Sequence, residues 1–205
     1  ISSHLVILVK DNDEWHIGTM LGCPDELNDA NSFSSISTRQ GYGFCDCGSE
    51  PSTIDVMNEK GKVDYGVDFE DFIVNVTCNE IGNEGYDTEA LKANIIAVKM
   101  CGWWAYEADY RREIYGCHIK NGDVNYLSYL ETTDENTKTV EDAVSDMDGW
   151  RMVSSSGTGG KLFYAAYFAG SYNSTGKGTG QLRQNGSNYL AESLGYDWKE
   201  ILHYY

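Results

Sequence analysis

The stretch from Ala90 to Ala105 constrains the fold of this chain more than any other part of the sequence. Among these residues only Lys92 and Lys99 are charged. The stretch predicts a helix about 24 Å long with almost no face for solvent. Such a helix must be covered on nearly every side, so we expect it to run through the core, with the rest of the chain packed around it.

A second helix is predicted immediately before this stretch. Apolar residues recur there at i, i+3, i+4 and i+7, on Phe69, Phe72, Ile73 and Val76. This spacing is typical of one buried helical face. Asp68 precedes the pattern and can cap the first turn through its carboxylate. The sequence Gly-Asn-Glu-Gly at 82–85 then interrupts the periodicity and separates the two helices.

The N-terminal third has the character of β-structure. Residues 5–9 and 15–21 are two apolar segments on either side of the polar turn 11–13, which favours a hairpin. Residues 22–66 are rich in Gly, Ser, Asn and Asp, so we expect loops and short strands there.

The C-terminal part alternates short elements with glycine. Thr139 can cap a short helix, and residues 151–154 and 162–168 have the composition of strands. A glycine-rich tract, 170–186, leads to two short helices. The second of these begins with Asp197-Trp-Lys-Glu200, which has the spacing of a capping box.

Because helices and strands alternate only in part, we expect the α+β class. Hydrophobic residues make up 41% of the 205 residues, which favours a packed globular domain. We interpret 1–205 as one domain, with a β-rich part at 1–66 and the main core at 67–205. The first residues show no basic region followed by an apolar stretch, so we expect no signal peptide or membrane anchor among these residues.

Charge restricts the classes of partner. The chain has 15 Lys and Arg residues against 32 Asp and Glu residues, a net charge of −17. Nucleic acid phosphates and anionic membrane surfaces would both repel such a protein. We therefore expect no nucleic acid partner. A neutral polymer, or a sugar polymer stripped of its peptides, remains compatible with this charge, although the acidity can also serve solubility alone.

Glu80 is the strongest candidate for chemistry. It follows Val76 by four residues and so falls on the apolar face, at the C-terminal end of the predicted helix. Burial and the negative end of the helix dipole would both raise its pKa. A carboxylic acid that is protonated near neutral pH can act as the general acid in glycosidic cleavage. The alternative is a surface glutamate at a helix end.

Three polar residues of the apolar helix are further candidates. Lys92 and Lys99 are seven residues apart and project from one side of the helix, where they could bind acidic substrate groups or orient Glu80. They could equally form a narrow solvated strip. Asn94 lies on another face, and it could be a substrate ligand or a buried polar residue with local partners.

Four segments carry a resemblance to known proteins: 69–81, 89–99, 177–186 and 198–205. Taken together, they resemble the SpoIID (stage II sporulation protein D) family, which includes proteins described as amidase enhancers. Residues 69–81 are similar to its helix leading to a Glu-containing GEM sequence, and 89–99 to its EALKAQAVAAR helix. Residues 177–186 are similar to its late glycine motif, and 198–205 to its closing YKEILxHYY. The segments occur in the order that the family has.

The resemblance implies a lytic transglycosylase that cleaves peptidoglycan glycan strands between N-acetylmuramic acid and N-acetylglucosamine. It places Glu80 at the catalytic acid/base, with Lys92, Asn94, Lys99, Lys177 and Gln181 among the substrate-binding residues. It implies an extracytoplasmic location and other cell-wall hydrolases as possible partners. The chain departs from the family where Lys177 replaces a histidine and where Leu182 and Arg183 replace a Met-Ser pair.

The cysteines and a possible zinc site are considered next. Some members of the family bind zinc through His and Cys residues that follow the central helix. Here Cys117 and His118 are adjacent, and neighbouring side chains seldom both reach one metal. We therefore expect no zinc and no other cofactor. The six cysteines include no CxxC pair, and the sequence leaves their redox state open.

Three alternatives differ in kind. Gly170 to Lys177 superficially resembles a phosphate loop, but its spacing is wrong and Gly178 stands where Ser or Thr would bind magnesium. A Cys/His amidase is disfavoured because Cys101 lies in the most apolar helix, where a packed thiol is expected. The remaining alternative is a non-catalytic module for glycan binding or amidase enhancement, in a cell-wall or phage-tail protein.

Overall fold

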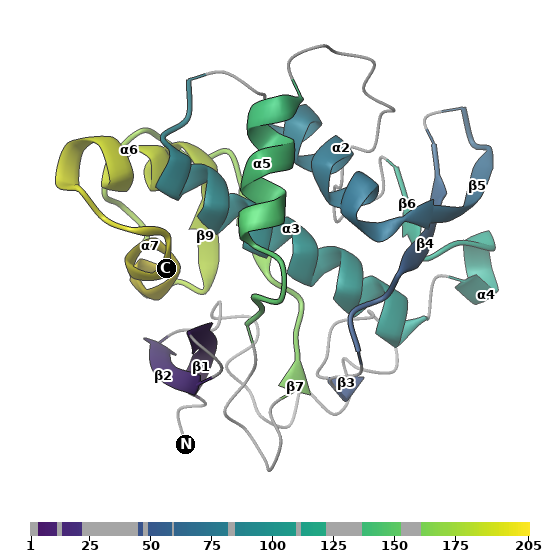
Figure 1. Ribbon diagram of the computed structural model, residues 1–205, viewed down its shortest axis with the longest axis horizontal. Coiled ribbons are helices and arrows are strands. Elements are labelled where there is room, and N and C mark those ends of the chain that lie inside the picture. The colour runs from purple at the N-terminus through teal and green to yellow at the C-terminus, as the bar shows by residue number, and fades with distance from the viewer. Residues whose placement is uncertain are drawn as a thin grey trace.

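The computed structural model describes residues 4–11, 14–21, 45–46, 49–58, 60–81, 85–109, 112–121, 137–152 and 161–205. These residues form a mixed α/β fold with helices and several small sheets, consistent with the α+β class. Helix α3 crosses the middle of the molecule, and the other elements are arranged around it (Figure 1).

Helix α3 (Thr88–Ala108) is the apolar helix predicted from the sequence, and its burial is confirmed. Every residue from 93 to 105 is buried. The carboxylate of Asp87 accepts a hydrogen bond from the Glu89 N–H and so caps the first turn. At the other end, Asp109 adopts a left-handed conformation with φ 46°, and its N–H donates to the Ala105 carbonyl.

Four helices cover α3: α2 (Phe69–Ile81), α5 (Lys138–Asp146), α6 (Gln184–Leu194) and α7 (Trp198–Tyr204). The predicted stripe of α2 is confirmed, because Phe69, Phe72, Ile73 and Val76 are all buried. Asp68 caps α2 as expected, accepting from the N–H groups of Glu70 and Asp71. The two helices approach closely at Gly102, where a Cβ atom would lie 2.5 Å from Phe72 Cε1.

The largest described sheet has three strands in the order β5–β4–β6. Strand β4 (Thr53–Met57) pairs antiparallel with β5 (Val63–Asp68), and the register shifts between Ile54 and Val56. On its other edge β4 pairs in parallel with β6 (Ile119–Lys120), which follows the short helix α4 (Arg112–Tyr115). This sheet lies at one end of α3, away from α6 and α7 (Figure 1).

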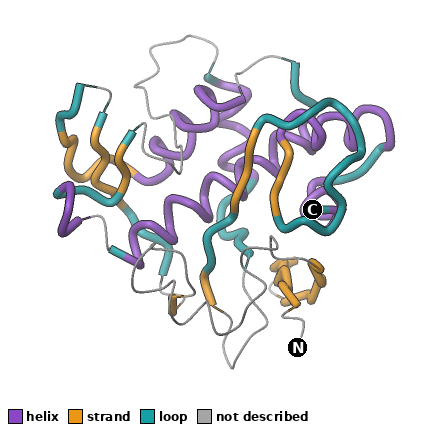
Figure 2. Tube along the Cα trace, turned by 180° about the vertical axis from the view of Figure 1, so that it is seen from behind, coloured by secondary structure: helices purple, strands orange, loops and turns teal. Residues whose placement is uncertain are grey.

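The remaining strands form pairs. Strands β1 (His4–Asp11) and β2 (Glu14–Leu21) form the antiparallel hairpin that the sequence predicts, although part of its turn lies outside the described residues. Strand β3 (Cys45–Asp46) pairs with β7 (Lys161–Leu162), and β8 (Ala166–Phe168) pairs in parallel with β9 (Gln181–Arg183). A glycine-containing loop joins β8 to β9 and curls beside the C-terminus (Figure 2).

Several boundaries differ from the sequence predictions. Helix α5 begins at Lys138, so Thr139 lies inside it and the prediction of a Thr139 cap was wrong. Thr137 occupies the cap instead, and its hydroxyl donates to the Glu141 side chain. Arg151 and Met152 are not in a strand, because the Met152 N–H is bonded to the sulfur of Met100 on α3 rather than to a neighbouring strand. Residues 153–154 lie outside the described residues.

Two further predictions hold in part. The predicted strand at 162–168 is divided, since residues 163–165 separate β7 from β8. The glycine tract is shorter than expected, because residues 184–186 already belong to α6. The capping box of α7 is confirmed, with Asp197 and Glu200 each accepting a hydrogen bond from the other's backbone N–H.

Candidate functional site

Glu80 lies in the last turn of α2, as the periodicity predicts, and its side chain is half-buried. The buried neighbours on its face of the helix are Ile73, Val76 and Thr77, which precede it by seven, four and three residues. The hydroxyl of Thr77 is sealed from solvent and forms no hydrogen bond. The fold therefore brings one carboxylate to the edge of the core while leaving part of it accessible.

Tyr167 on β8 is the polar residue that the structure connects to Glu80. Its hydroxyl is buried and has no hydrogen-bond partner. Burial raises the pKa of Tyr167 well above its ordinary value, and the nearby charges of Cys101 and Glu80 raise it further. Cys101 itself is held by a hydrogen bond of 2.8 Å from its sulfur to the Ala165 carbonyl. Glu80 on α2 and Cys101 on α3 are thus near enough to Tyr167 on β8 to affect its pKa.

Lys92 and Lys99 share one side of α3, as their spacing predicts, and both face α5. The Lys92 ammonium lies 3.1 Å from the Asp146 carboxylate and 3.8 Å from that of Glu89. The Lys99 ammonium lies 2.7 Å from the Glu50 carboxylate and 3.5 Å from the Met147 carbonyl. The two lysines are therefore engaged in ion pairs and do not form a solvated strip.

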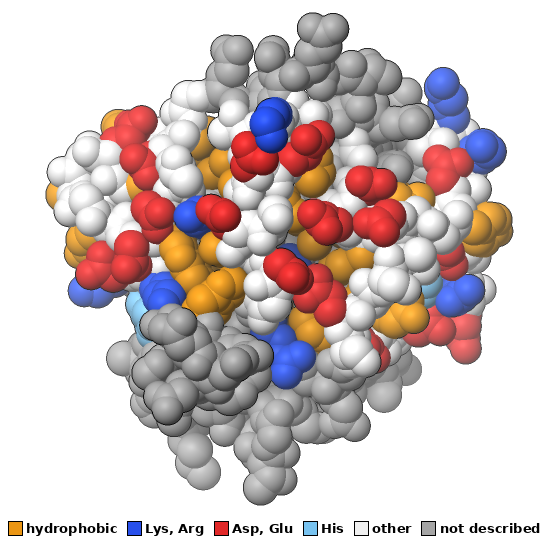
Figure 3. Space-filling model, viewed as in Figure 1, with side chains coloured by type: hydrophobic (Ala, Val, Ile, Leu, Met, Phe, Trp, Pro, Cys, Tyr) orange, Lys and Arg blue, Asp and Glu red, His pale blue; other side chains and the backbone are white. Residues whose placement is uncertain are grey.

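Lys99 lines a small cleft between α2, α3 and α5. The cleft is lined by Glu50, Glu70, Ile73, Ile95, Lys99, Val144, Met147 and Asp148. Figure 3 shows carboxylates scattered across the face that carries α5, in keeping with the acidic composition. The space it leaves for a ligand is about 30 Å³, far below that of typical ligand pockets, so the cleft could hold a water-sized group but not a sugar ring.

Asn94 faces a different element from the lysines. Its side-chain amide donates to the Ala90 carbonyl and to the Ser187 hydroxyl on α6, each across 2.8 Å. Its carbonyl oxygen is buried and has no hydrogen-bond partner. Of the two interpretations of Asn94, these contacts favour a buried polar residue that joins two helices.

Gln181 and Lys177 belong to the glycine motif. Gln181 begins β9 opposite Ala166, while the next residue, Leu182, is opposite Tyr167. Because side chains alternate along a strand, Gln181 points to the face opposite the one that carries Leu182. Lys177 is exposed, and its ammonium lies 5.7 Å from the centre of the Tyr204 ring. The candidate residues thus make separate sets of contacts and are not shown to share one site.

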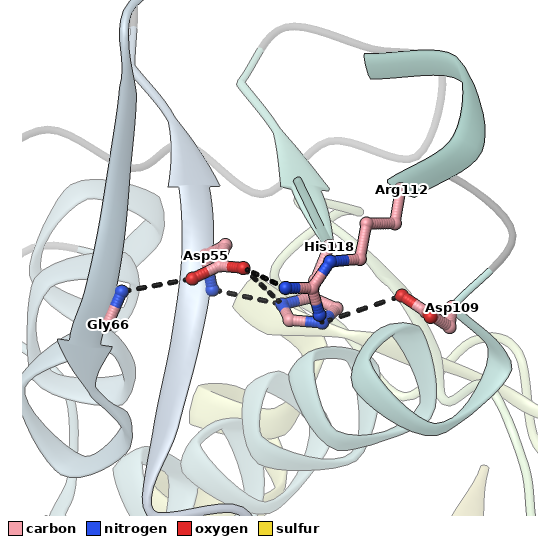
Figure 4. Close-up of polar contacts among 5 residues, drawn as sticks. All are labelled: Asp55, Gly66, Asp109, Arg112 and His118. Atoms are coloured by element: carbon pink, nitrogen blue, oxygen red, sulfur yellow. Dashed lines mark hydrogen bonds and ion pairs between the residues drawn. The ribbon is translucent and has the colours of Figure 1, made fainter. Parts of the chain in front are cut away.

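A polar cluster at the end of α3, in which Asp55 and His118 are buried and Asp109 and Arg112 are exposed, was not predicted. The Nδ1 atom of His118 accepts a hydrogen bond of 3.0 Å from the Asp55 backbone N–H. In return, the backbone N–H of His118 donates to the backbone carbonyl of Asp55. Arg112 bridges the two side chains, 3.2 Å from Asp55 Oδ2 and 3.1 Å from His118 Nε2. Asp109 Oδ1 lies 3.5 Å from the same His118 nitrogen (Figure 4).

In His118, Nδ1 accepts a hydrogen bond, which favours the neutral ring with its proton on Nε2, where Asp109 can accept it. In that tautomer the Arg112 guanidinium, which can only donate, lies against Nε2 without a hydrogen bond to it. Burial lowers the pKa of His118, and although the charges of Asp55 and Asp109 oppose this effect, the net shift is downward. The cluster ties β4, β6, α4 and the end of α3 together. The only signal in the sequence was the Cys117-His118 pair, which was considered and disfavoured as a zinc site and which gave no indication of Asp55.

Comparison with known proteins adds no family assignment, because the chain matches no family model and no curated protein. Within the described residues, no three His, Cys, Asp or Glu side chains are arranged to hold a metal ion. In the same part of the chain, no helix combines the length and the apolar composition that crossing a bilayer requires.

Proposed function

We propose that this chain is a SpoIID-like lytic transglycosylase of peptidoglycan with Glu80 as its acid/base. The observation that carries the proposal is the placement of Glu80 in the last turn of α2, half-buried and near enough to Tyr167 for its charge to raise the pKa of that tyrosine. The ordered resemblance of four segments to the SpoIID family supports it. The negative net charge is compatible with an uncharged sugar backbone as substrate.

In the proposed reaction, Glu80 donates its proton to the glycosidic oxygen as the bond from that oxygen to C1 of muramic acid breaks. The C6 hydroxyl of the same sugar then attacks C1 and returns its proton to Glu80. The product is a 1,6-anhydro ring, and no water is consumed. Because the attacking hydroxyl belongs to the substrate, a single carboxylate suffices where most glycosidases need two.

The setting follows from the substrate. A domain that cleaves peptidoglycan strands would act outside the cytoplasm, where other cell-wall hydrolases would be its partners. The supporting residues would include Lys92 and Lys99. Their ion pairs with Asp146 and Glu50 mean that a substrate could engage either lysine only by competing with a carboxylate of the protein.

The test is glycan cleavage by the unmodified protein and by Glu80→Gln, on purified strands stripped of peptide. The Gln side chain keeps the volume and removes the titrating proton, so cleavage should fall by at least ~100-fold. Glu113→Gln is the matched control, since Glu113 is exposed on α4 and should retain full activity. Mass spectrometry of the products should find 1,6-anhydro ends.

Reducing ends in place of anhydro ends would mean that water attacks, and the transglycosylase mechanism would be lost. Full activity of the Gln variant would exclude Glu80 from catalysis. Absence of cleavage by the unmodified protein, with glycan binding retained, would favour the non-catalytic module instead.

A further inference from the structure

Helix α4 carries no buried side chain, and its polar side-chain contacts with the neighbouring sheet come from Arg112. The Arg112 guanidinium lies 3.2 Å from Asp55 Oδ2 on β4 and 3.1 Å from His118 Nε2 (Figure 4). The Tyr115 ring adds a contact with the Lys120 ammonium, 4.3 Å from the ring centre, and such a contact is weak where solvent reaches it. The order of α4 therefore depends on what Arg112 is paired with.

Protonation of His118 disturbs both polar neighbours of its ring. The neutral ring accepts a hydrogen bond of 3.0 Å at Nδ1 from the Asp55 N–H, and its Nε2 lies next to Arg112. An imidazolium ring carries a proton on each nitrogen and accepts no hydrogen bond. On protonation, the Asp55 N–H therefore loses its acceptor, and a positive ring lies 3.1 Å from the positive guanidinium. One of the two neighbours has to move.

Arg112 is the neighbour that can move. The backbone of Asp55 is fixed by the sheet, because the His118 backbone N–H donates to the Asp55 carbonyl. The pairing of β4 with β6 continues at Val56 and Ile119. In contrast, the Arg112 side chain is 50% exposed and belongs to a helix without buried residues. The guanidinium can therefore turn into water, whereas the strands cannot separate without breaking the sheet.

The Asp55 carboxylate offers the protonated ring a new partner. Its Oδ1 accepts a hydrogen bond of 2.9 Å from the Gly66 N–H, which fixes the orientation of the group. Its Oδ2 lies 3.2 Å from Arg112 and 3.8 Å from His118 Nδ1. A small rotation of the ring brings a protonated Nδ1 within hydrogen-bond distance of this oxygen. The same oxygen thus faces two alternative cations, one on α4 and one beside β6.

The direction of the response to pH follows from the groups around the ring. Among the described residues, the charged groups that face it are Asp55 on β4, Asp109 at the end of α3 and Arg112 on α4. The Tyr106 ring of α3 also lies against it, with 4.8 Å between ring centres. Burial lowers the pKa of His118, and the charge of Arg112 lowers it further. The two carboxylates raise the pKa, but the net shift is downward. Departure of Arg112 removes one lowering effect, so the released form binds the proton more tightly and is favoured by acid, below pH ~6.5.

We propose that Asp55, Arg112 and His118 form an acid-released latch for α4. At neutral pH the Asp55 carboxylate pairs with Arg112 and keeps α4 against the sheet. On mild acidification, protonated His118 takes over this carboxylate, and Arg112 leaves with α4 while β4 and β6 stay paired. The latch lies at the end of α3 that carries the sheet, and it is independent of the glycan chemistry proposed for Glu80.

The test follows His118 and α4 in the same sample. NMR spectra of the protein labelled with ¹³C and ¹⁵N are recorded from about pH 7.5 to about pH 5. The ring resonances of His118 report its protonation, and the ¹H–¹⁵N heteronuclear NOE values of residues 113–116 report the mobility of α4. As His118 takes up its proton, these NOE values should fall with the same midpoint. Those of α3 and α6 should stay high, because the latch opens without unfolding the core.

Two variants separate the two cations. Arg112→Gln removes the charge that opposes protonation, so the midpoint of the His118 titration should rise by at least ~0.5 pH unit, with α4 mobile throughout. His118→Asn leaves the Asp55 carboxylate to Arg112, so α4 should stay ordered over the whole pH range. Lys62→Gln is the matched control, since it removes an equal charge from an exposed ion pair with Asp64 beside the same sheet. It should leave both the midpoint and the mobility of α4 unchanged.

An α4 that stays ordered while His118 titrates, or a His118 that stays neutral down to pH ~5, would overturn the inference. So would loosening of α4 in the His118→Asn variant, because a carboxylate such as Asp109 would then be the titrating group. Loss of order in α3 and α6 at the same pH would indicate global unfolding and not a latch. Equal shifts of the midpoint in Lys62→Gln and Arg112→Gln would mean that only the overall charge matters.

Discussion

The ammonium of Lys99 lies 2.7 Å from the carboxylate of Glu50, and the lysine side chain is only 3% exposed whereas that of Glu50 is 32% exposed. The pair is therefore asymmetric in its access to water. If Glu50 is lost, the ammonium stays buried, and its remaining partner among the described residues is the Met147 carbonyl at 3.5 Å. If Lys99 is lost, the carboxylate can still be hydrated.

This asymmetry predicts which of two variants, Glu50→Gln or Lys99→Met, loses more free energy of unfolding. Glu50→Gln should lower the free energy of unfolding by about 1–3 kcal/mol, because it leaves a buried charge poorly paired. Lys99→Met should cost less, since it removes the charge and fills most of the volume. Urea denaturation of both variants measures the difference. Lys138→Met, which breaks the exposed pair with Asp142, is the control and should have no measurable effect. The reverse order for the two buried variants would contradict the prediction.

Gly102 is predicted to be required where α2 crosses α3. A Cβ atom there would lie 2.5 Å from Phe72 Cε1 and 3.2 Å from Phe69 Cε2. Overpacking of this kind costs about 1–3 kcal/mol, against a gain in helix propensity of about 1 kcal/mol. Gly102→Ala should therefore destabilise the protein. In a Phe72→Leu background the same change should become neutral or stabilising, because the clash is gone. A cost that is equal in both backgrounds would show that Phe72 is not the cause.

The lowered pKa of His118 is predicted to make the folded protein less stable on mild acidification. Its pKa is lowered in the folded protein, whereas the unfolded chain has the ordinary value of about 6.5. The unfolded state therefore takes up a proton first as the pH falls. Stability should be unaffected by this residue above pH ~7 and should decline below pH ~6.5, by at most about 1.4 kcal/mol per pH unit.

The measurement is the melting temperature between pH 7.5 and pH 5.5 for the unmodified protein and for His118→Asn. The Asn oxygen can replace Nδ1 as the acceptor of the Asp55 N–H but does not titrate. The variant should show a flatter dependence on pH over this interval. Parallel curves for the two proteins would show that His118 is not the group responsible.

The protein is predicted to tolerate loss of the Tyr167 hydroxyl. Its buried hydroxyl has no hydrogen-bond partner, and such a group costs free energy in the folded state. Tyr167→Phe should therefore leave the free energy of unfolding unchanged or raise it by up to about 1 kcal/mol. Chemical denaturation provides the measurement. A loss of more than about 1 kcal/mol would mean that the hydroxyl has a partner in solution, such as a bound water.

The sequence predicted those parts of the fold whose signals are local. The near absence of charge from Ala90 to Ala105 and the apolar stripe of α2 each identify a helix without reference to the rest of the chain. The cap of α5 was misplaced by two residues, because Thr137 and Thr139 are both good caps and the choice depends on how α5 packs. The local pattern at Arg151 likewise could not show that the Met152 N–H would bond to Met100 on α3.

The candidate site was less predictable because its contacts join distant residues. Helical spacing was sufficient to place Lys92 and Lys99 on one side of α3, but not to identify Glu50 as a partner. Asp55 and His118 are 63 residues apart, and no periodicity connects them. For Asn94 the sequence left two interpretations open. The contact with Ser187, which lies 93 residues further along the chain, favours the structural one.

The central burial of α3 also has a consequence for synthesis on the ribosome. The helix cannot be covered fully until α6 and α7 have emerged, since Asn94 bonds to Ser187 and the Trp198 N–H donates to the Glu89 carboxylate. At a translation rate of about 5–20 residues per second, the roughly 100 residues that follow Ala105 take on the order of 5–20 s to make. During that interval the most apolar segment of the nascent chain lacks part of its cover, which makes it the segment that a chaperone would recognise first.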